Sequence, residues 1–430
     1  MHNLDLNLTQ ISKIEGKASC AVKIRSGRVE DVKFSISEYK RFYTQAIRGK
    51  DILALPQLTA RICGTCSNAH LLCAIKAVED ALGVTPSSQT VLLRKLLNYG
   101  LIIRDHALHL YVFVLPDLFE KDSILDFDEN NPLEHKFLDA AFKVKAAGNK
   151  LGIAVGGRSV HAPFAAVGGF TRLPDPLEIS SVRENLTSVR KEITDLIDFF
   201  YTNDRSLIRK DLLFSGLIDK EYSFLYGQIH QSSGKVQSEE NFGHHLEHVI
   251  IPYSHASGYK FRGRIYMVGA LARLNLAKDK LHPKTIASVK KYIKIFPSEN
   301  IYHNNLAQAI EILHAVDSAT DLIDKLQIVA EKPVIAPRKE GIGLGVIEAP
   351  RGTLYYRLQV DSFGKIKTGQ IVVPTGQNQI GIEASIRQYL TDNIAKIKDR
   401  EDMENSIETI VRAFDPCMSC ASHFLKFKYV

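Results

Sequence analysis

Two cysteine pairs of identical spacing lie near opposite ends of the chain, Cys63–Cys66 and Cys417–Cys420, and a histidine follows each pair, His70 after the first and His423 after the second. Thiolate and imidazole groups are the usual ligands of zinc and of softer transition metals. A loop of roughly 350 residues separates the pairs, so an ion bound by both would join the start of the fold to its end. The residue types and their spacing therefore predict a metal site.

The identity of the metal is open from spacing alone. Two Cys-x-x-Cys elements most often build a structural tetrahedral zinc site, and a single one beside a strand-helix unit can be a redox motif. The pairs of such zinc sites usually come from segments about 15 to 20 residues apart, much closer than the two pairs of this chain. A structural zinc site and a softer transition-metal centre are both interpretations of the pattern.

The first pair has a spacing that suits the start of a helix. At about 100° per residue, Cys66 would lie about 60° and His70 about 20° from Cys63, so all three would share one face. A thiol at a helix N-terminus feels the positive end of the dipole, and Arg61 adds charge, which favours the metal-binding thiolate. The alternative for His70 is a hydrogen-bonded core histidine.

The second pair follows Asp415-Pro416, and a proline restricts the residue before it and turns the chain. This predicts two thiolates pointed inward from a loop or from the first turn of a helix. Asp415 itself is a candidate cap for that turn.

Composition places the chain among ordinary globular proteins. Its 430 residues are 45% hydrophobic and 24% charged, and the net charge of +7 is spread along the chain rather than gathered in runs. We therefore expect no nucleic-acid partner. The chain begins without a charged-then-apolar export signal, and its most apolar segments are interrupted by charges or glycines, which predicts a cytoplasmic protein with no membrane span.

The elements that must position these residues are mainly helical. Alternating and β-branched residues predict a small antiparallel sheet over about 4–37, with Ser26-Gly27 as a turn, and a second β-rich stretch over 341–374. Helical periodicity covers segments 66–82, 90–114, 135–151, 179–201, 283–294, 304–325, 380–397 and 403–414. We expect a mainly α fold, a long-helix bundle with small antiparallel β elements, in one domain over 1–430 that ends in the metal-ligand motif 415–423.

With their flanking residues, the two cysteine elements resemble the signature motifs of the nickel-iron hydrogenase large subunit. The matching segments are Arg61-Ile62-Cys63-Gly64-Thr65-Cys66-Ser67-Asn68-Ala69-His70 and Asp415-Pro416-Cys417-Met418-Ser419-Cys420-Ala421-Ser422-His423. Other pieces of the family pattern follow in the expected order: Lys13-Ile14-Glu15-Gly16, Arg104-Asp105-His106, Gly157-Arg158-Ser159-Val160-His161-Ala162-Pro163, Ala349-Pro350-Arg351-Gly352 and Val373-Pro374-Thr375. The resemblance covers essentially the whole chain.

The resemblance implies a centre in which all four cysteines hold nickel. Cys63 and Cys417 would be terminal ligands, and Cys66 and Cys420 would also bridge to an iron that carries carbon monoxide and cyanide. Soft thiolates suit nickel, and an open coordination position is what a molecule such as H2 needs. Heterolytic cleavage of H2 leaves a proton for a nearby base, and the candidates are Cys417 and the guanidine of Arg351.

The resemblance also implies how the surroundings of the metals are built. Arg351 would lie over them, held by Asp105 and Asp415, since a planar guanidinium can bind two carboxylates and a cyanide together. Pro350 and Thr375 would line the cofactor, with the Thr375 hydroxyl donating to a cyanide. The alternative for Arg351 is a surface residue of a turn.

Two further residues receive roles from the resemblance. Glu15 would pass protons between the terminal cysteine and the outside, and its alternative is a solvated glutamate at a strand end. His70 would hydrogen-bond a cysteine sulfur and so tune the metal rather than bind it.

Two features depart from the commonest family pattern. The glutamate that helps to bind a second ion, magnesium or iron, should fall near Thr44 or Gln45, and neither is acidic. His423 therefore has two alternative roles, as a ligand of a second ion or as a residue that only forms hydrogen bonds. Many relatives also end just after this histidine, whereas residues 424–430 follow it here, so maturation factors either remove this tail or leave it in place.

The expected function is the catalytic subunit of a nickel-iron hydrogenase that oxidises H2 or runs the reverse reaction. Beyond the two pairs, only Cys20 and Cys73 remain, which we expect to be buried, so the chain has no thiols for iron-sulfur clusters. A small iron-sulfur partner subunit is implied. The alternatives are a hydrogen sensor with the same metals, a structural zinc protein, and a quinone-reductase subunit of the same fold, which would have no use for the four thiols.

Overall fold

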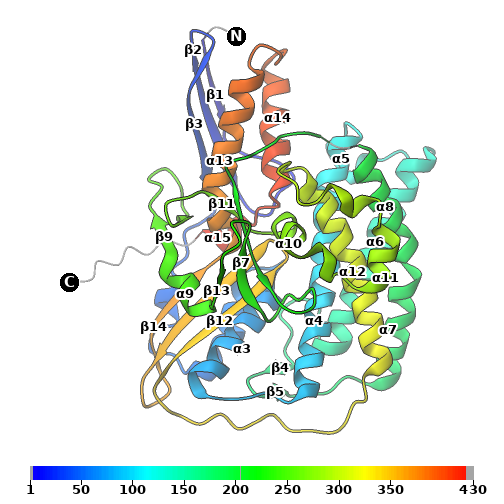
Figure 1. Ribbon diagram of the computed structural model, residues 1–430, viewed down its shortest axis with the longest axis vertical. Coiled ribbons are helices and arrows are strands. Elements are labelled where there is room, and N and C mark those ends of the chain that lie inside the picture. Colours follow the sequence, from blue (N-terminus) through cyan, green and yellow to red (C-terminus); the bar gives the residue numbers. More distant parts are fainter. Residues whose placement is uncertain (1–2, 204, 423–430) are drawn as a thin grey trace.

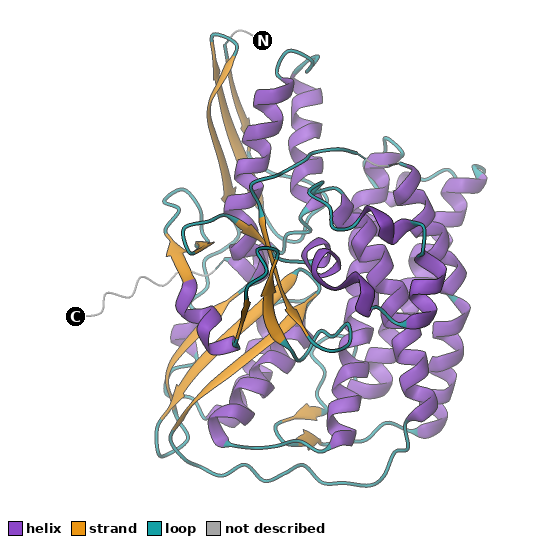
Figure 2. Ribbon diagram, in the orientation of Figure 1, coloured by secondary structure: helices purple, strands orange, loops and turns teal. Residues whose placement is uncertain are grey.

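Long helices packed side by side form the larger part of the molecule. The computed structural model describes residues 3–203 and 205–422. Many of its helices gather on one side of Figure 1, and other helices lie among the strands on the opposite side. Small antiparallel sheets make up most of the rest, as the strands in Figure 2 show. The predicted fold class, a mainly α long-helix bundle with small antiparallel β elements, is therefore confirmed.

The helices of the bundle begin and end where their sequences supply caps. Helix α4 (Ser88–Ala107) starts after Ser87, whose hydroxyl accepts a hydrogen bond from the Thr90 backbone N–H. Helix α6 (Pro132–Gly156) starts with a proline in its first turn and ends at Gly157, which takes a left-handed conformation. These two pack against each other and against α12 (His303–Lys325), α7 (Pro176–Ser188) and α8 (Arg190–Thr202). The bundle therefore fixes the position of α4, which carries Asp105.

A three-stranded antiparallel sheet at the N-terminus follows the prediction closely. Its strands β1 (Leu4–Leu8), β2 (Ala18–Arg25) and β3 (Arg28–Ile36) pair in sequence order, and the β2–β3 turn is the expected Ser26-Gly27. Helix α13 (Pro374–Asn393) packs along β3, and α14 (Arg400–Ala413) packs on α13 (Figure 1). The two ends of the chain therefore lie together, as a site shared by both cysteine pairs requires.

The second β-rich stretch forms a sheet that holds helix α3 (Ser67–Leu82), the helix that follows the first cysteine pair. Strands β12 (Gly341–Ala349), β13 (Gly352–Val360) and β14 (Ile366–Val372) are antiparallel neighbours. Gly341, Gly343 and Gly345 face α3, and a Cβ on any of them would overlap a backbone carbonyl oxygen of that helix. Glycine is needed at these positions because the strand and the helix are so close, and β12 therefore fixes the distance of α3 from the sheet.

We expect Gly343→Ala to lower the free energy of unfolding by about 1–3 kcal/mol or more, because its methyl group would overlap the carbonyl oxygen of Ala77. Urea unfolding followed by circular dichroism measures this change. Gly216→Ala is the control, since a Cβ at that strand position would meet its nearest atom at 3.6 Å. Equal stabilities of the two variants would contradict the close-approach argument.

Three local predictions were wrong in detail. Cys63 is not part of a helix: its backbone is extended, and α3 starts only after Cys66. The segment 90–114 changes from α4 to a π-helix, η3 (Leu108–Val114), which widens the turn that carries His109. The segment 179–201 breaks at Val189, where the Ser188 hydroxyl bonds the Asn185 carbonyl and competes with the helix.

The region between α8 and α11 (Pro283–Val289) was not predicted from the sequence. It holds short strands and two helices: β6 (Leu213–Ile218), β7 (Gln228–Gln231), β8 (Val236–Gln237), α9 (Glu239–His245), β9 (Leu246–Val249), β10 (Gly258–Phe261), β11 (Tyr266–Met267) and α10 (Ala270–Ala277). The remaining elements are short: α1 (Tyr43–Ala46), η1 (Ile52–Ala54), α2 (Leu55–Thr59), η2 (Ala60–Ile62), α5 (Leu115–Leu118), η4 (Ile124–Asp126), β4 (Ala165–Ala166), β5 (Gly169–Phe170), η5 (Lys278–Lys280), η6 (Tyr292–Ile295) and α15 (Met418–Ala421).

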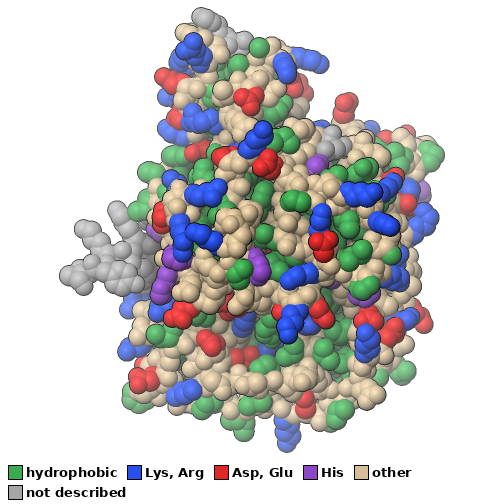
Figure 3. Space-filling view, in the orientation of Figure 1, with side chains coloured by type: hydrophobic (Ala, Val, Ile, Leu, Met, Phe, Trp, Pro, Cys, Tyr) green, Lys and Arg blue, Asp and Glu red, His purple; other side chains and the backbone are tan. Residues whose placement is uncertain are grey.

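Charged side chains of both signs are interspersed on the face of the molecule shown in Figure 3. This arrangement agrees with the scattered charge of the sequence. Within residues 3–203 and 205–422, no helix combines the length and the apolarity needed to cross a bilayer.

Candidate metal centre

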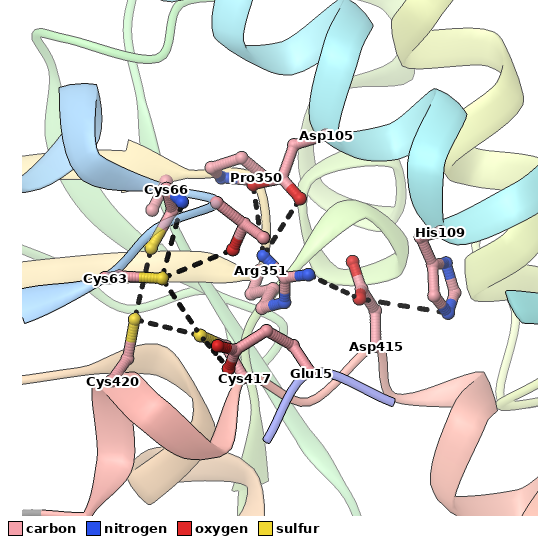
Figure 4. A network of polar contacts seen from close by, with 12 residues as sticks. Glu15, Cys63, Cys66, Asp105, His109, Pro350, Arg351, Asp415, Cys417 and Cys420 are labelled. Atoms are coloured by element: carbon pink, nitrogen blue, oxygen red, sulfur yellow. Dashed lines mark hydrogen bonds and ion pairs between the residues drawn. The ribbon is translucent and has the colours of Figure 1, made fainter. Parts of the chain in front are cut away.

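The four cysteines of the two pairs lie in one buried cluster, with all four sulfur atoms within 4.8 Å of one another. The Sγ atoms of Cys63 and Cys417 are 3.4 Å apart, those of Cys66 and Cys420 are 3.1 Å apart, and those of Cys417 and Cys420 are 3.0 Å apart (Figure 4). Each N-terminal cysteine thus faces a C-terminal one. Four converging sulfur donors suit a soft transition-metal ion.

The backbone holds the C-terminal pair against the start of the chain. Cys417 directly precedes α15, and Cys420 lies within it. The Met418 N–H donates to the Glu15 carbonyl at 2.9 Å, and the Tyr43 hydroxyl donates to the Cys420 carbonyl at 2.7 Å. The cluster can therefore form only after both ends of the chain have docked.

Four thiols this close together could not all ionise without a cation beside them. Hydrogen bonds from the neighbouring thiols hold the pKa of Cys63 well below its ordinary value. Burial raises the pKa of Cys417 and Cys420 well above theirs. A bound cation would stabilise all four thiolates, so the cluster is built for an occupied site.

A small cavity of about 10 Å³, measured as the space open to the centre of a water-sized sphere, lies on one side of the cluster. Its lining residues are Cys66, His70, Ala349, Arg351, Leu354, Pro374, Thr375, Cys417 and Cys420. Cys63 is absent from this lining, whereas the other three cysteines, Cys66, Cys417 and Cys420, border the space. A second metal with small ligands fits this asymmetry. Pro350 does not line the cavity either; its carbonyl accepts a hydrogen bond from Arg273 Nη2 at 2.9 Å.

Arg351 lies over the cavity, held between two carboxylates (Figure 4). Its Nη1 is 3.1 Å from both carboxylate oxygens of Asp105, and its Nη2 is 3.0 Å from Asp415 Oδ1. All three side chains are buried. Burial acts to lower the pKa of Arg351, but the two carboxylates outweigh it and raise the pKa well above its ordinary value. The guanidinium is therefore a fixed positive charge.

Asp415 is brought to Arg351 by an unusual backbone conformation. Its φ of +47° lies in the left-handed region, which aspartate tolerates better than most residues, and Pro416 follows. The structure thus assigns its side chain to the guanidinium, and the predicted alternative, a helix cap, is not what it does: α15 has no side-chain cap.

Thr375 and His70 both face the cluster from the cavity side. The Thr375 hydroxyl oxygen accepts from the Cys417 N–H at 2.9 Å, which leaves its own proton to be donated elsewhere. His70 Nε2 is 3.4 Å from Cys420 Sγ, and its Nδ1 is 2.7 Å from the Tyr356 hydroxyl. Burial lowers the pKa of His70 to about 4, so the ring is neutral and can donate one N–H to the sulfur.

Glu15 touches the cluster from the side of the N-terminal sheet. Its Oε2 accepts from Cys417 Sγ at 2.9 Å and from the Ser419 N–H at 3.1 Å, and its Oε1 accepts from the Ser419 hydroxyl at 2.5 Å. Glu15 is half-buried, so the carboxyl spans from the thiol toward the surface. Sequence reasoning missed Ser419, because a serine between two cysteines carries no signal of its own.

The second-ion hypothesis at His423 stays a prediction. His423 and the tail 424–430 lie outside the described residues. Thr44 is buried and Gln45 exposed. Among the residues that the structure describes, the four cysteines are the one group of histidine, cysteine and acidic side chains that could hold an ion.

Comparison with protein families gives a match to the model described as nickel-dependent hydrogenase, over residues 41–138 and 219–423. These two segments cover more than half of the chain and contain all four clustered cysteines.

Individual proteins agree with this match. The chain is 30% identical to sulfhydrogenase 2 subunit alpha of Pyrococcus furiosus over 424 residues, covering 98% of this chain and 99% of that protein. It is 32% identical to sulfhydrogenase 1 subunit alpha of the same organism over 440 residues, covering 99% and 100%. A solved structure of an NAD+-reducing [NiFe]-hydrogenase in the H2-reduced state superposes with a TM-score of 0.88 at 21% identity, covering 98% of this chain and all of that one.

Proposed function

The chain belongs to the nickel-dependent hydrogenase family, as the catalytic large subunit of a nickel-iron enzyme that acts on H2, and from this premise we propose which of its residues hold the metals and move the proton.

Nickel would be held by all four sulfur atoms of the cluster, with Cys63 and Cys417 as its terminal ligands. Cys66 and Cys420 would also hold the iron. Both line the cavity together with Cys417, whereas Cys63 does not, so the cavity supports Cys63 as a terminal ligand and the assignment of Cys417 rests on the family resemblance. When bound, this centre supplies the coordination position at which H2 reacts and the metals that take up its electrons.

The observation that carries this assignment is an unpartnered buried donor. Arg351 Nε has no hydrogen-bond partner among the described residues, although the side chain lines the cavity. A buried donor normally has an acceptor, and the Thr375 hydroxyl also has a proton to donate. Two donors lining the same cavity favour small acceptor ligands on the iron, and the cyanides of the family would serve.

The proton from H2 is assigned to Cys417 and then to Glu15. Arg351 carries a fixed positive charge, so it acts as a hydrogen-bond donor and electrostatic partner, and of the two candidate bases Cys417 is favoured. The Cys417 thiol lies 2.9 Å from the Glu15 carboxylate, within reach for direct transfer. Ser419 orients that carboxylate through its backbone N–H and its hydroxyl.

Electrons must leave through a partner subunit. The relatives are named as single subunits of larger hydrogenases. The two cysteines outside the cluster, Cys20 and Cys73, are buried in β2 and α3, and neither can hold an iron-sulfur cluster with the others. We infer that the partner carries iron-sulfur clusters and accepts the electrons.

An infrared spectrum of the purified native complex tests the proposed centre, in the region of carbonyl and cyanide stretching. We expect one carbonyl band and two cyanide bands, nickel and iron on metal analysis, and H2-dependent reduction of an artificial acceptor. Zinc with no bands would contradict the assignment. Bands without appreciable turnover would identify the sensor alternative.

A further inference from the structure

One face of helix α12 is polar although the helix is buried in the bundle. Asn304, Gln308 and Glu311 are 2%, 1% and 0% exposed. Their spacing of four and three residues places them on one side of the helix. A row of buried polar groups is costly unless each has a partner, so the contacts of this row indicate what it holds in place.

Gln308 contacts one of the two carboxylates that bind Arg351. Its Nε2 donates to Asp415 Oδ2 at 2.8 Å, and its Oε1 lies 2.6 Å from His109 Nδ1. The Gln308 amide thus binds one carboxylate oxygen of Asp415, and the other oxygen, Oδ1, faces the Arg351 guanidinium.

Asn304, one turn earlier, holds the chain just before Asp415. Its Nδ2 donates to the Ala413 carbonyl at 3.0 Å, and its Oδ1 accepts from the Leu271 N–H at 2.9 Å. The segment in which Asp415 takes its left-handed conformation is therefore tied to α12 at two points.

Glu311 is linked to the residues beside Arg351 and Asp105 through Arg273 and His106. It accepts from Arg273 Nε and Nη2 at 2.6 and 2.7 Å, and its Oε2 is 2.8 Å from His106 Nε2. Arg273 in turn donates to the carbonyls of Ala349 and Pro350 at 3.1 and 2.9 Å. These carbonyls directly precede Arg351, and His106 directly follows Asp105.

The charges of this arrangement are stable. Burial would raise the pKa of Glu311, but the Arg273 guanidinium outweighs it and lowers the pKa to about 2. Glu311 and Arg273 therefore form an ion pair at neutral pH, and their side chains hold each other in place.

We propose that Asn304, Gln308 and Glu311 of α12, together with Arg273, position Arg351 over the metal centre. Arg351, Asp105 and Asp415 come from three elements, the β12–β13 turn, α4 and the loop before α15, and this polar row contacts the surroundings of all three. These four are positioning residues. The inference rests on the role proposed above for Arg351.

Gln308→Met tests the proposal, because methionine has nearly the shape of glutamine and no amide. We expect kcat for H2 oxidation to fall about 10- to 100-fold with the KM for the artificial acceptor unchanged, since a misplacement near 1 Å can cost about 100-fold. Nickel content should stay at the wild-type level, and the cyanide bands in the infrared spectrum should shift. Gln379→Met is the control, since Gln379 is equally buried and bonds Ser254 instead.

A double-mutant cycle with Arg351→Lys separates positioning from general damage. If Gln308 acts through Arg351, Gln308→Met should have little further effect in the Arg351→Lys protein. Losses that multiply, or equal losses in the Gln379 control, would overturn the proposal. If the Gln308→Met protein cannot be purified with nickel bound, Gln308→Asn replaces it, since asparagine keeps the amide on a shorter side chain. The same loss of kcat and the same shift of the cyanide bands are expected for that variant. Full activity in Arg351→Lys alone would instead overturn the role of Arg351, and the positioning proposal with it.

Discussion

Arg351→Lys is expected to reduce H2 oxidation by about 100- to 10,000-fold while nickel and iron stay bound. The guanidinium reaches Asp105 with one nitrogen and Asp415 with another, and a lysine ammonium is a point charge that cannot span both carboxylates. Loss of one preorganised donor alone typically costs about 100- to 1,000-fold. The measurement is acceptor-linked H2 oxidation, normalised to nickel content.

The size of this loss does not depend on losing charge, because lysine keeps it. The two carboxylates hold the pKa of Arg351 well above its ordinary value, so the wild-type enzyme should show no pH dependence from this side chain.

A matched control is available in the same bundle. Arg94 is buried and binds both carboxylate oxygens of Glu79, at 2.8 and 2.5 Å, without contact to the cluster. Arg94→Lys should lower stability and leave kcat per nickel close to wild type. Near-normal kcat in Arg351→Lys, or an equal loss in both variants, would remove the special role of Arg351.

Much of the fold could be predicted from the sequence because the helical periodicity of its long helices is clear and Ser26-Gly27 marks the turn between β2 and β3. The limits of the helices were less accurate: α6 extends to the cap Gly157, beyond the predicted end at residue 151. The stretch between α8 and α11 could not be predicted. Its strands are two to six residues long, too short for an alternating pattern to stand out, and β11 pairs with β6 in parallel across a distant part of the chain.

The metal cluster was predicted partly for the wrong reason. Cys63, Cys66 and His70 were expected to share one face of a helix, but the backbone of Cys63 is extended. His70 contacts Cys420, which belongs to the C-terminal pair. The thiols converge because the N-terminal and C-terminal segments pack against each other. A local sequence pattern cannot predict such a contact between distant segments.

The surroundings of the metals depend even more on long-range contacts. Asp105 and Arg351 are 246 residues apart, so only the family resemblance could pair them. The polar row on α12 is readable in the sequence, yet polar residues at such a spacing normally indicate a solvent-exposed face. In this chain the same pattern faces inward, toward Asp415 and Arg273.

Glu15→Gln is expected to stop net turnover, with a loss of at least about 100-fold, and to leave the metal content unchanged. Glutamine has the shape of glutamate and can still accept from Ser419, so the local structure should persist. It cannot take up a proton at neutral pH, and general acid-base transfer at the Cys417 thiol is therefore lost. Acceptor-linked H2 oxidation measures the loss.

Spectroscopy under H2 can then separate proton exit from the reaction at the metals. If Glu15 acts only after H2 has been cleaved, the infrared bands of Glu15→Gln should still respond to H2 although turnover has stopped. Glu408→Gln is the control, because Glu408 accepts from the backbone N–H and hydroxyl of Ser12 at 3.0 and 2.7 Å, the same pattern that Ser419 gives Glu15, without touching a cysteine. Glu408 also forms an ion pair with Arg412 Nη1 at 3.0 Å, so this control includes the loss of an ion pair. Wild-type turnover in Glu15→Gln would mean that protons leave by another route. Since both variants exchange one carboxylate for an amide beside a serine, a loss confined to Glu15 would come from its contact with Cys417 rather than from the change in charge.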